Sequence, residues 1–480
     1  MQKTETDKVY PSIIDGKDIY HNENGVLVTS ASNRPLYRFS PFSISDESMY
    51  DLATNAKQGF HEWSSFPTEK KVEIFNKAKE LLKERKEELK ESHLEIGGPG
   101  WFADFNVDGT VGQLQEYTSQ LSRSPGNIVQ SPDNDLAFTY KQPIGPVLSI
   151  SPWNAPVILA GRSILAPLAA GCSVIHKSSE KSPRSSYLLV KCFLDAGVPP
   201  KALQLVHIKP EENSKFIDEV LQSGAIKKVN FTGSTFVGSK IAEKCGKYLI
   251  PYTLELGGKN LSIILSDANL DKAADAILFG AWAHRGQICM STDKVFVDET
   301  IYDKFKSKLI EAAKEFSKDK DQQLSQRDAI GRDKVLDLVE DALNKGAKLV
   351  YGKFDKDAIL KSNVIEPMIL EDANSEASIY TQESFGPVFT LHKFKAVEDV
   401  IEEVNEHDYG LKGSVWSTNI VKALNIAKKL EIGGVHINAP TVSDETTVPH
   451  GGVKSSGVGR FNSQWGMDEF LIIKAITINE

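Results

Sequence analysis

The chain has 480 residues, of which 40% are hydrophobic and 25% charged, and its formal net charge is −9. These proportions are typical of a globular protein and argue against a disordered chain, a collagen-like repeat or a coiled coil. The acidic balance argues against broad electrostatic binding of nucleic acid or anionic lipid. The sequence contains no apolar run of about 20 residues, so no membrane span is predicted.

The four cysteines form no CxxC pair, and the polar start of the chain does not resemble a secretory signal. A secreted disulfide scaffold would have a much higher density of cysteine. We therefore expect free thiols in a reducing compartment, with the cytoplasm as the default location. Three of the thiols lie in apolar patterns or near a helix end and are expected to be small buried hydrophobes: Cys172, Cys192 and Cys245.

Residues 1–60 show no clear periodicity and are expected to be irregular. A helix is predicted from Thr68, because apolar residues at helical spacing alternate there with lysine and glutamate. Between residues 146 and 265, apolar strand-like runs alternate with helical stretches such as Arg184–Ala196. The predicted strands cover residues 147–151, 172–176, 203–208, 228–232 and 261–265. This alternation needs crossover connections and predicts a parallel sheet covered by helices on both faces.

A second alternating series follows Cys289. It contains a predicted strand at Lys294–Val297, helical patterns at residues 305–316 and 335–342, and another strand at Lys348–Tyr351. The sequence therefore predicts two α/β domains, joined near residues 255–260.

Two residues stand out as candidates for chemistry. Cys289 lies in the turn-like segment Arg-Gly-Gln-Ile-Cys-Met-Ser-Thr, which could expose its thiol as a nucleophile; burial as a small hydrophobe is the alternative. Glu255 stands in an apolar run just before a double glycine. Burial of that carboxylate is costly unless it has a partner or a role, so a local pair and a catalytic base are both open.

Two further segments favour ligand binding. Asn154 follows a predicted parallel strand, at the end of the sheet where ligands bind in open α/β folds. Its amide could donate to an oxyanion, although an asparagine beside proline also forms turns. The segment from Gly233 to Gly238 follows a strand and opens a helix, where backbone N–H groups can approach a diphosphate. Its spacing is not the common GxGxxG, so alone it is a weak signal.

Taken together, these segments resemble the aldehyde dehydrogenase superfamily over nearly the whole chain. The family's motifs stand in order: Ser-Pro-Trp-Asn (151–154), His-Lys-Ser-Ser-Glu (176–180), Phe-Thr-Gly-Ser-Thr-Phe-Val-Gly (231–238), Glu-Leu-Gly-Gly-Lys (255–259), Gly-Gln-Ile-Cys (286–289) and Glu-Ser-Phe-Gly-Pro (383–387). The segment from Pro449 to Gly457 resembles the closing motif.

The resemblance implies a mechanism for the oxidation of an aldehyde to a carboxylic acid. Cys289 would attack the aldehyde carbon, and the amide of Asn154 with the backbone N–H of Cys289 would hold the oxyanion. Glu255 would activate the water that hydrolyses the resulting thioester. No metal is expected.

The resemblance also implies NAD as cofactor. Trp153 belongs to the cofactor-binding set, and Lys177 and Glu180 match residues on the adenosine ribose. The pyrophosphate would lie on Gly233, Ser234 and Gly238, and the nicotinamide ribose beside Glu383 and Phe385. Glu180 would repel a 2′-phosphate, so NAD is favoured, with NADP as the alternative.

The fold implied by the family has two Rossmann-like three-layer α/β domains and a small β flap for oligomerisation. Residues 1–125 and 143–256 would form the NAD-binding domain, and residues 257–450 the catalytic domain. The flap and C-terminal strand would comprise residues 126–142 and 451–480, with strands at 136–142 and 470–478. A homodimer or a homotetramer is expected by analogy.

The motifs look most like those of the salicylaldehyde, vanillin and benzaldehyde dehydrogenases, so an aromatic aldehyde is the expected substrate. The expected substrate-lining residues are Trp101, Arg162, Ile288, Met290 and His450. Arg162 could contact a ring hydroxyl or carboxylate, or form a structural ion pair. His450 occupies a position where many members have phenylalanine. The alternatives are a broad-specificity or an aliphatic or semialdehyde dehydrogenase, a CoA-acylating member, and a non-catalytic relative.

Overall fold

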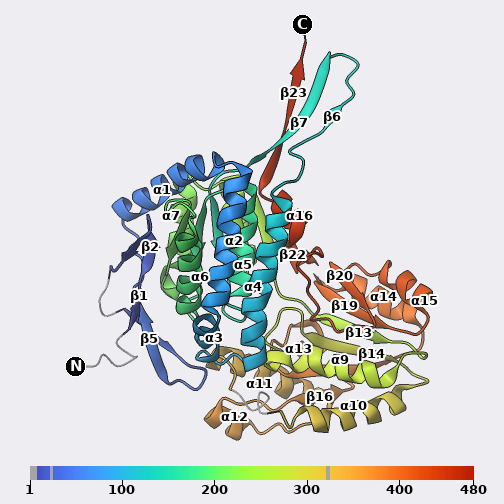
Figure 1. Cartoon of the computed structure of the whole chain (residues 1–480). Coiled ribbons are helices and arrows are strands. Elements are labelled where there is room, and N and C mark those ends of the chain that lie inside the picture. Colours follow the sequence, from blue (N-terminus) through green and yellow to red (C-terminus); the bar gives the residue numbers. More distant parts are fainter. Residues whose placement is uncertain (1–7, 22–24, 320–324, 480) are drawn as a thin grey trace.

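The structure, a computed structural model, describes residues 8–21, 25–319 and 325–479. Two large sheets with helices on their faces form the body, and a narrow β flap projects from it (Figure 1). Among the described helices, none is long and apolar enough to cross a lipid bilayer.

The first sheet has eight strands in the order β22-β12-β11-β8-β9-β10-β2-β3. Its centre is parallel, as predicted, and consists of β8 (Val147–Ile150), β9 (Val174–Lys177), β10 (Leu203–Val206), β11 (Lys228–Thr232) and β12 (Tyr252–Glu255). Four of these strands, β8 to β11, lie within a few residues of predicted ranges. The strand β12 was not predicted, and the predicted strand at residues 261–265 corresponds to β13 of the second sheet.

Alternate residues of the central strands enter two different cores. Val147 and Val174 pack with α2 (Thr68–Glu84), α3 (Lys86–Leu94), α4 (Gly100–Gln120), α5 (Ile158–Ala170) and α6 (Pro183–Ala196). Their neighbours Leu148 and Ile175 pack on the other face with α1 (Asp46–Ser64), α7 (Asn213–Gln222) and α8 (Thr235–Lys247). Because both faces are buried, these strands read as continuous apolar runs.

The expectation that residues 1–60 are irregular is wrong for the described part of this segment. It contains β1 (Val9–Tyr10), β2 (Ser12–Ile14), β3 (Lys17–Ile19), β4 (Val26–Thr29), β5 (Pro35–Phe39) and α1. Strands of two to five residues are too short to show a period of two. The helix has an N-cap at Ser45, whose hydroxyl accepts from the backbone N–H of Ser48 at 3.3 Å.

The second sheet has seven strands in the order β15-β16-β17-β14-β13-β19-β20. They are β13 (Asn260–Ile264), β14 (Thr292–Asp298), β15 (Lys348–Tyr351), β16 (Met368–Glu371), β17 (Val388–Phe394), β19 (Lys412–Trp416) and β20 (Gly434–Ile437). All neighbouring pairs are parallel except β15 with β16. The helices of this half are α9 (Leu270–Trp282), α10 (Tyr302–Phe316), α11 (Ala329–Asn344), α12 (Lys356–Ser362), α13 (Ser378–Thr381), α14 (Val397–Glu406) and α15 (Ile420–Ala427).

The chain passes from the first sheet to the second between Glu255, the last residue of β12, and Asn260, the first of β13. The last part of the chain returns to the first sheet, where β22 (Gly457–Val458) pairs with β12. We propose the domain boundaries that were predicted from the sequence, and this arrangement of the two sheets supports them.

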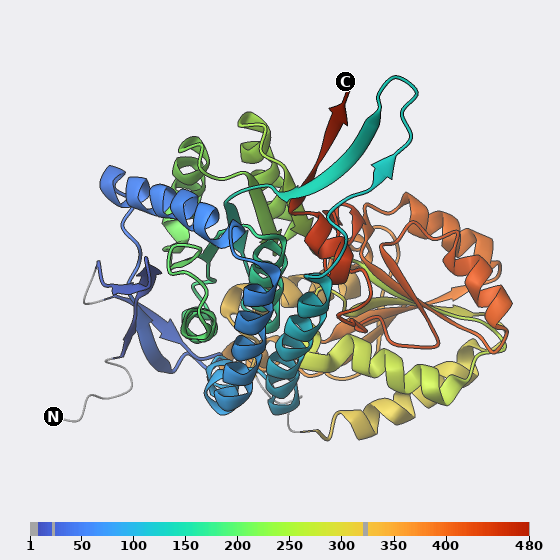
Figure 2. The ribbon, with the colours of Figure 1, turned by 45° about the horizontal axis from the view of Figure 1, so that its top comes forward.

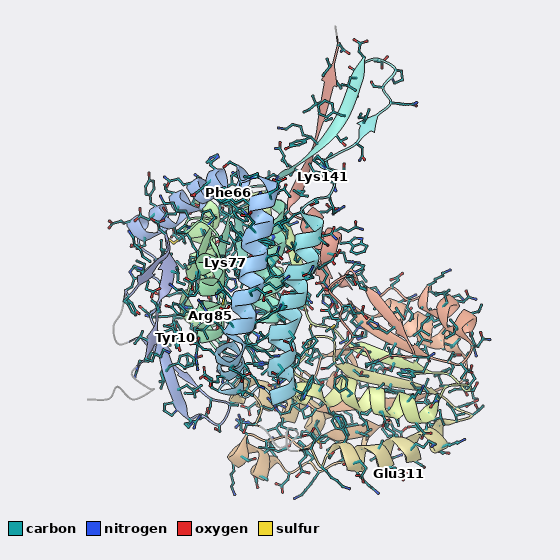
Figure 3. The ribbon with its side chains drawn as sticks, in the orientation of Figure 1. Tyr10, Phe66, Lys77, Arg85, Lys141 and Glu311 are labelled. Atoms are coloured by element: carbon teal, nitrogen blue, oxygen red, sulfur yellow. The ribbon has the colours of Figure 1, made fainter. Side chains whose placement is uncertain are left out.

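The flap is a three-stranded sheet made of β6 (Ile128–Val129), β7 (Leu136–Pro143) and β23 (Leu471–Ile478). It stands away from the body in both views (Figures 1 and 2). At its base, Lys141 is held by Asp468 of α16 (Ser463–Asp468), with 2.8 Å between Nζ and Oδ1 (Figure 3). The predicted strands at 136–142 and 470–478 are confirmed to within one residue.

Candidate active site

A cavity of about 210 Å³ brings together loops from both sheets. The three predicted catalytic residues line it, together with Trp153, Gly233, Ser234, Glu383 and Phe385. The loops after β8 and β11 and the end of β12 all contribute, which places the cavity at the carboxyl ends of the parallel strands.

The loop that carries Cys289 connects α9 to β14 and has a tightly constrained backbone. His284 and Arg285 have φ values of 48° and 56°, and Gly286 has a φ of 70°. A Cβ atom on Gly286 would lie 2.1 Å from the carbonyl oxygen of Gly386, so only glycine fits there. The loop therefore has little freedom, and it leaves Cys289 partly exposed while the other three cysteines are buried, as expected.

The surroundings of Cys289 do not favour a free thiolate. Burial, and after it the charge of Glu255, raises the pKa of the Cys289 thiol well above its ordinary value, while Arg162 opposes this shift. A reaction at this thiol consequently needs a base close to the sulfur, and Glu255 lines the same cavity.

Two asparagine side chains hold this loop. Asn154 donates from Nδ2 to the carbonyl oxygen of Gln287 at 2.9 Å. Asn260 donates from Nδ2 to the carbonyl oxygens of Cys289 (2.8 Å) and Ser291 (2.9 Å), and its Oδ1 accepts from the backbone N–H of Lys412 at 3.0 Å. The role of Asn260 was missed from the sequence, although its place directly after Glu-Leu-Gly-Gly-Lys was a signal.

We expect Asn260→Ala to lower the free energy of unfolding by about 3 kcal/mol, because it leaves buried backbone groups without a partner. Aldehyde oxidation is expected to fall as well, since the carbonyl of Cys289 loses its anchor. Urea denaturation and steady-state rates measure the two effects. The matched control is Asn405→Ala, which removes a similar bridge between Lys429 and Glu431, away from the cavity. An equal loss of activity in both variants would contradict the anchoring role.

Glu255 lies at the carboxyl end of β12 and is fully buried. Within the described residues neither of its carboxylate oxygens has a hydrogen-bond partner. The strand β22 pairs beside it, with Gly457 opposite Glu255. Gly457 has a φ of 145°, and a Cβ there would lie 2.2 Å from the carbonyl oxygen of Leu254. The glycine of the closing motif thus lets the chain pass close to the backbone of β12 at Leu254 and Glu255.

The glycine-rich segment after β11 forms one wall of the cavity. Ser234 is the N-cap of α8, and its hydroxyl accepts from the backbone N–H of Val237 at 3.4 Å. The helix N-terminus favours a negatively charged group. Gly238 lies outside the cavity lining, and a Cβ on it would meet the side chain of Leu256 at 2.4 Å. This glycine lets α8 pack closely on the segment that follows β12.

Lys177 and Glu180 lie beyond the residues that line this cavity, at the end of β9 and in the turn after it. Lys177 is buried, and its Nζ donates to the carbonyl oxygen of Ser178 at 3.1 Å. Burial lowers the pKa of this lysine, and Glu180 opposes that shift.

Glu383 and Phe385, which lie before β17, also line the cavity. Glu383 accepts from the backbone N–H of Gly258 at 3.2 Å, and the ring of Phe385 lies 6.3 Å from that of Trp153 in an edge-on arrangement. Burial raises the pKa of Glu383 to about 7, against the opposing charge of Lys334.

The raised pKa of Glu383 predicts a pH-dependent stability. Between its usual value of 4.5 and about 7, the folded protein holds a proton on Glu383 that the unfolded chain has lost. The contribution of this group to stability therefore falls as the pH rises through that window. We expect Glu383→Gln to gain stability relative to the wild type as the pH rises from about 5 to about 8, in denaturant unfolding without cofactor. Glu402→Gln, on the exposed side of α14, is the control; a constant difference for Glu383→Gln would refute the assignment.

The expected substrate-lining residues are distributed over different environments. Ile288 and Met290 flank Cys289 within an apolar cluster that also contains Phe102, Ala155, Ile158, Leu159, Ala283 and Leu411. Trp101 is 40% exposed and packs on Phe102 and Phe279, with ring centroids 5.2 and 5.5 Å away, outside the residues that line the cavity.

Arg162 and His450 are buried in a polar row that ends at Glu255. Arg162 forms an ion pair with Asp444, which is the structural alternative considered for this arginine. The imidazole of His450 lies between the two carboxylates: its Nδ1 is 3.6 Å from Oδ1 of Asp444, and its Nε2 is 3.5 Å from Oε1 of Glu255. Asp444 was not identified from the sequence, because no motif surrounds it.

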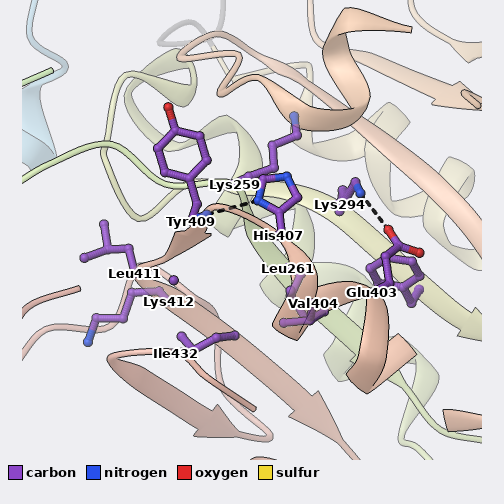
Figure 4. Close-up of a pocket in the computed structure, with 12 residues that line it drawn as sticks. Lys259, Leu261, Lys294, Glu403, Val404, His407, Tyr409, Leu411, Lys412 and Ile432 are labelled. Carbon is purple, nitrogen blue, oxygen red and sulfur yellow. Dashed lines mark hydrogen bonds and ion pairs between the residues drawn. The ribbon is translucent and has the colours of Figure 1, made fainter. Parts of the chain in front are cut away.

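A second cavity, of only about 10 Å³, lies beside β13 and β19 (Figure 4). Lys294 forms an ion pair with Glu403 there, with 2.8 Å between Nζ and Oε1. Nζ of Lys259 lies 3.3 Å from Oδ1 of Asp293. Burial lowers the pKa of Lys294 to about 8. This space holds no more than a water molecule, so it is a structural ion-pair cluster and not a substrate site.

Two mainly parallel sheets covered by helices, with a partly exposed thiol in a cavity between their loops, are typical of an α/β enzyme. Residues 33–476 match the aldehyde dehydrogenase family. The chain belongs to this family and is an oxidoreductase that acts on aldehydes.

Relatives and solved structures agree with this assignment. A salicylaldehyde dehydrogenase from Pseudomonas putida is 33% identical over 473 residues, which cover 95% of this chain and 97% of the relative. A vanillin dehydrogenase from a Pseudomonas species is 36% identical, with 89% of each chain covered. The crystal structure of a Pseudomonas putida salicylaldehyde dehydrogenase with salicylaldehyde has a TM-score of 0.93, 30% identity and 98% coverage of both chains. That of a Staphylococcus aureus betaine aldehyde dehydrogenase with NAD⁺ has a TM-score of 0.91 and 27% identity, covering 98% of this chain and 95% of that one.

Proposed function

We propose that this protein oxidises an aromatic aldehyde to its carboxylic acid with NAD, through a thioester on Cys289. The observation that carries the proposal is the geometry of one cavity, which holds a partly exposed thiol, a side-chain amide and a buried carboxylate. These three groups supply the nucleophile, the oxyanion donor and the base that the oxidation requires.

In the proposed reaction the Cys289 sulfur bonds to the aldehyde carbon after its proton has passed to Glu255. Asn154 Nδ2 and the backbone N–H of Cys289 then stabilise the oxyanion. After oxidation the carbon is a thioester. Glu255 first releases the thiol proton to solvent. It then takes a proton from water while the water oxygen attacks that carbon, and the C–S bond breaks to release the acid and the thiolate.

The cofactor follows from the residues around the cavity. The N-terminus of α8 with Gly233 and Ser234 suits a pyrophosphate, and Glu383 with Phe385 suits the nicotinamide ribose. Bound NAD would accept the hydride from the carbon of the cysteine adduct. Glu180, near Lys177, favours a free ribose hydroxyl over a 2′-phosphate. Turnover with NAD and NADP at equal concentration tests this preference.

The aromatic preference rests on the small, apolar surroundings of the thiol. Ala155, Leu159 and Phe102 belong to the apolar cluster against which Cys289 packs, and the relatives with the same motifs are named for aromatic aldehydes. The test compares kcat/KM for benzaldehyde and salicylaldehyde with that for acetaldehyde and hexanal. A clear preference for the aliphatic aldehydes would overturn the substrate class, and absence of NADH formation with all four would overturn the proposed activity.

We also propose that the flap joins subunits in a homodimer or homotetramer. Its strands expose apolar side chains, with Ile128 81% and Ile473 69% exposed, and its outer edges have free backbone groups. Light scattering on the full chain and on Ile473→Lys tests the role: the variant is expected to dissociate, and an unchanged mass would count against it.

A further inference from the structure

Four ionisable side chains form a buried row that leads away from the thiol: Glu255, His450, Asp444 and Arg162. Glu255 comes from β12, Arg162 from α5, and both Asp444 and His450 from the segment between β20 and β21 (Val453–Lys454). Glu255, His450 and Arg162 are buried, and the side chain of Asp444 is only slightly exposed. A row of this kind needs an explanation, because buried charges are costly unless their neighbours compensate them.

The outer half of the row is a firmly held ion pair. Asp444 pairs with Arg162, and its Oδ1 also accepts from Nδ2 of Asn462 at 2.9 Å. Burial raises the pKa of Asp444, but Arg162 and His450 outweigh burial and hold it well below the usual value. Asp444 is therefore a fixed anion next to the imidazole.

Two backbone hydrogen bonds fix the position of His450. Its N–H donates to the carbonyl oxygen of Phe461 at 3.1 Å, and its own carbonyl accepts from the N–H of Phe461 at 2.7 Å. Burial lowers the pKa of the imidazole, with Asp444 opposing, so the ring is neutral at neutral pH. With the anionic Asp444 beside Nδ1, the proton of the neutral ring belongs on Nδ1, which leaves the lone pair of Nε2 facing Glu255.

The geometry of the row allows a proton to move along it. The imidazole of His450 lies between the carboxylates of Glu255 and Asp444, and the cations around these two carboxylates are Arg162 and Lys412. A proton added to the imidazole therefore lies between two carboxylates, which stabilise the imidazolium. A proton that Glu255 takes from the attacking water can pass to Nε2 of His450, 3.5 Å away.

We propose that His450, oriented by Asp444, is a positioning residue that accepts from Glu255 the proton released during thioester hydrolysis. In this step the O–H bond of water breaks, the C–O bond forms, the C–S bond breaks, and the proton ends on Nε2. The imidazolium returns it through Glu255 when the acid has left and solvent has entered the cavity. The inference rests on the proposed function, because it requires Glu255 to act as the base.

The test uses the full chain with benzaldehyde and NAD. His450→Phe keeps an aromatic ring in the site, and His450→Gln keeps a polar group that cannot take a proton. Stopped-flow absorbance is expected to show, for both variants, a fast burst of about one NADH per site followed by turnover about tenfold or more below the wild type near pH 7. His392→Phe, on β17 and outside the residues that line the cavity, is the control and is expected to turn over as the wild type does.

The pH profile separates proton transfer from a structural effect. The ionisable groups around His450 are Asp444, Glu255, Arg162, Lys412, His436 and Cys289. They are common to the wild type and the variants, so their titration alone leaves the ratio of rates unchanged. Hydroxide replaces the missing acceptor as the pH rises, so the deficit of both variants is expected to shrink towards about pH 9.5.

Three outcomes would overturn the inference: wild-type turnover in either variant, no burst in His450→Phe, or a deficit that is constant with pH. The proposed function fails by a different result, which is a wild-type chain that forms no NADH with any aldehyde. If the wild type forms NADH and the His450 variants turn over at the wild-type rate, the proposed function stands and only the role of His450 is removed.

Discussion

Cys289→Ala is expected to lower the rate of aldehyde oxidation by at least about 10³-fold. The sulfur is the only nucleophile in the proposed reaction, and an alanine methyl group cannot form the adduct from which the electrons leave. Among the four cysteines only Cys289 is partly exposed, so no other thiol reaches the cavity. The rate of NADH formation with benzaldehyde measures the loss, because the cofactor changes its absorbance on reduction.

Cys192→Ala is the matched control for this experiment. Cys192 lies in the core between α6 and its neighbours, and burial raises the pKa of its thiol to about 11. Its replacement is expected to leave kcat/KM unchanged. If Cys289→Ala retained a tenth or more of the wild-type rate, the thioester route would be wrong. Mass spectrometry of the wild type, quenched during turnover, should also find the acyl group on the peptide that contains Cys289.

The α/β architecture could be predicted because its signal is local. Four central strands of the first sheet, β8 to β11, are buried on both faces, so a short apolar run marks each of them, and helices with a clear apolar face separate the runs. The fifth, β12, was not among the predicted strands. The predicted strand at residues 228–232 coincides with β11, and the predicted helix at 184–196 differs from α6 by one residue.

The N-terminal strands could not be predicted because their signal is not local. The strand β2 has three residues and is defined by its antiparallel pairing with β10, through Ile13 and Leu205. Nothing within three residues identifies a partner almost 200 positions away. The same holds for β22, whose two residues form a strand only beside β12.

The site shows the same division between local motifs and long-range contacts. Cys289, Glu255 and Asn154 could be identified by the motifs around them, and the fold brings all three to one cavity. The partner of Arg162 could not be identified from a motif, because Asp444 is 282 residues away. From the sequence, an ion pair and a substrate contact were therefore equally open for this arginine. Once Asp444 neutralises Arg162, the arginine is less available to a substrate carboxylate. Specificity then depends more on the apolar residues around Cys289.

Glu255→Gln is the other replacement with a large expected effect, a fall in steady-state turnover of about 10²–10⁴-fold. Glutamine has nearly the same shape but cannot accept a proton from water. The first NADH equivalent is still expected to form, because the replacement removes the charge of Glu255 that raises the pKa of the Cys289 thiol, and hydroxide can then deprotonate it. Each later turnover waits for hydrolysis of the thioester. Stopped-flow absorbance near pH 8.5 therefore should show a burst and then a nearly flat line.

The variant also tests how far the buried row acts as one unit. If the proton reaches His450 only through Glu255, then His450→Phe added to Glu255→Gln has nothing further to remove, and the double variant should turn over as slowly as Glu255→Gln alone. If the two losses multiply instead, His450 acts on the reaction by a route that does not pass through Glu255. Glu255 is the nearest carboxylate to Nε2, at 3.5 Å, and Asp444 faces the other ring nitrogen, so the geometry favours the non-additive result.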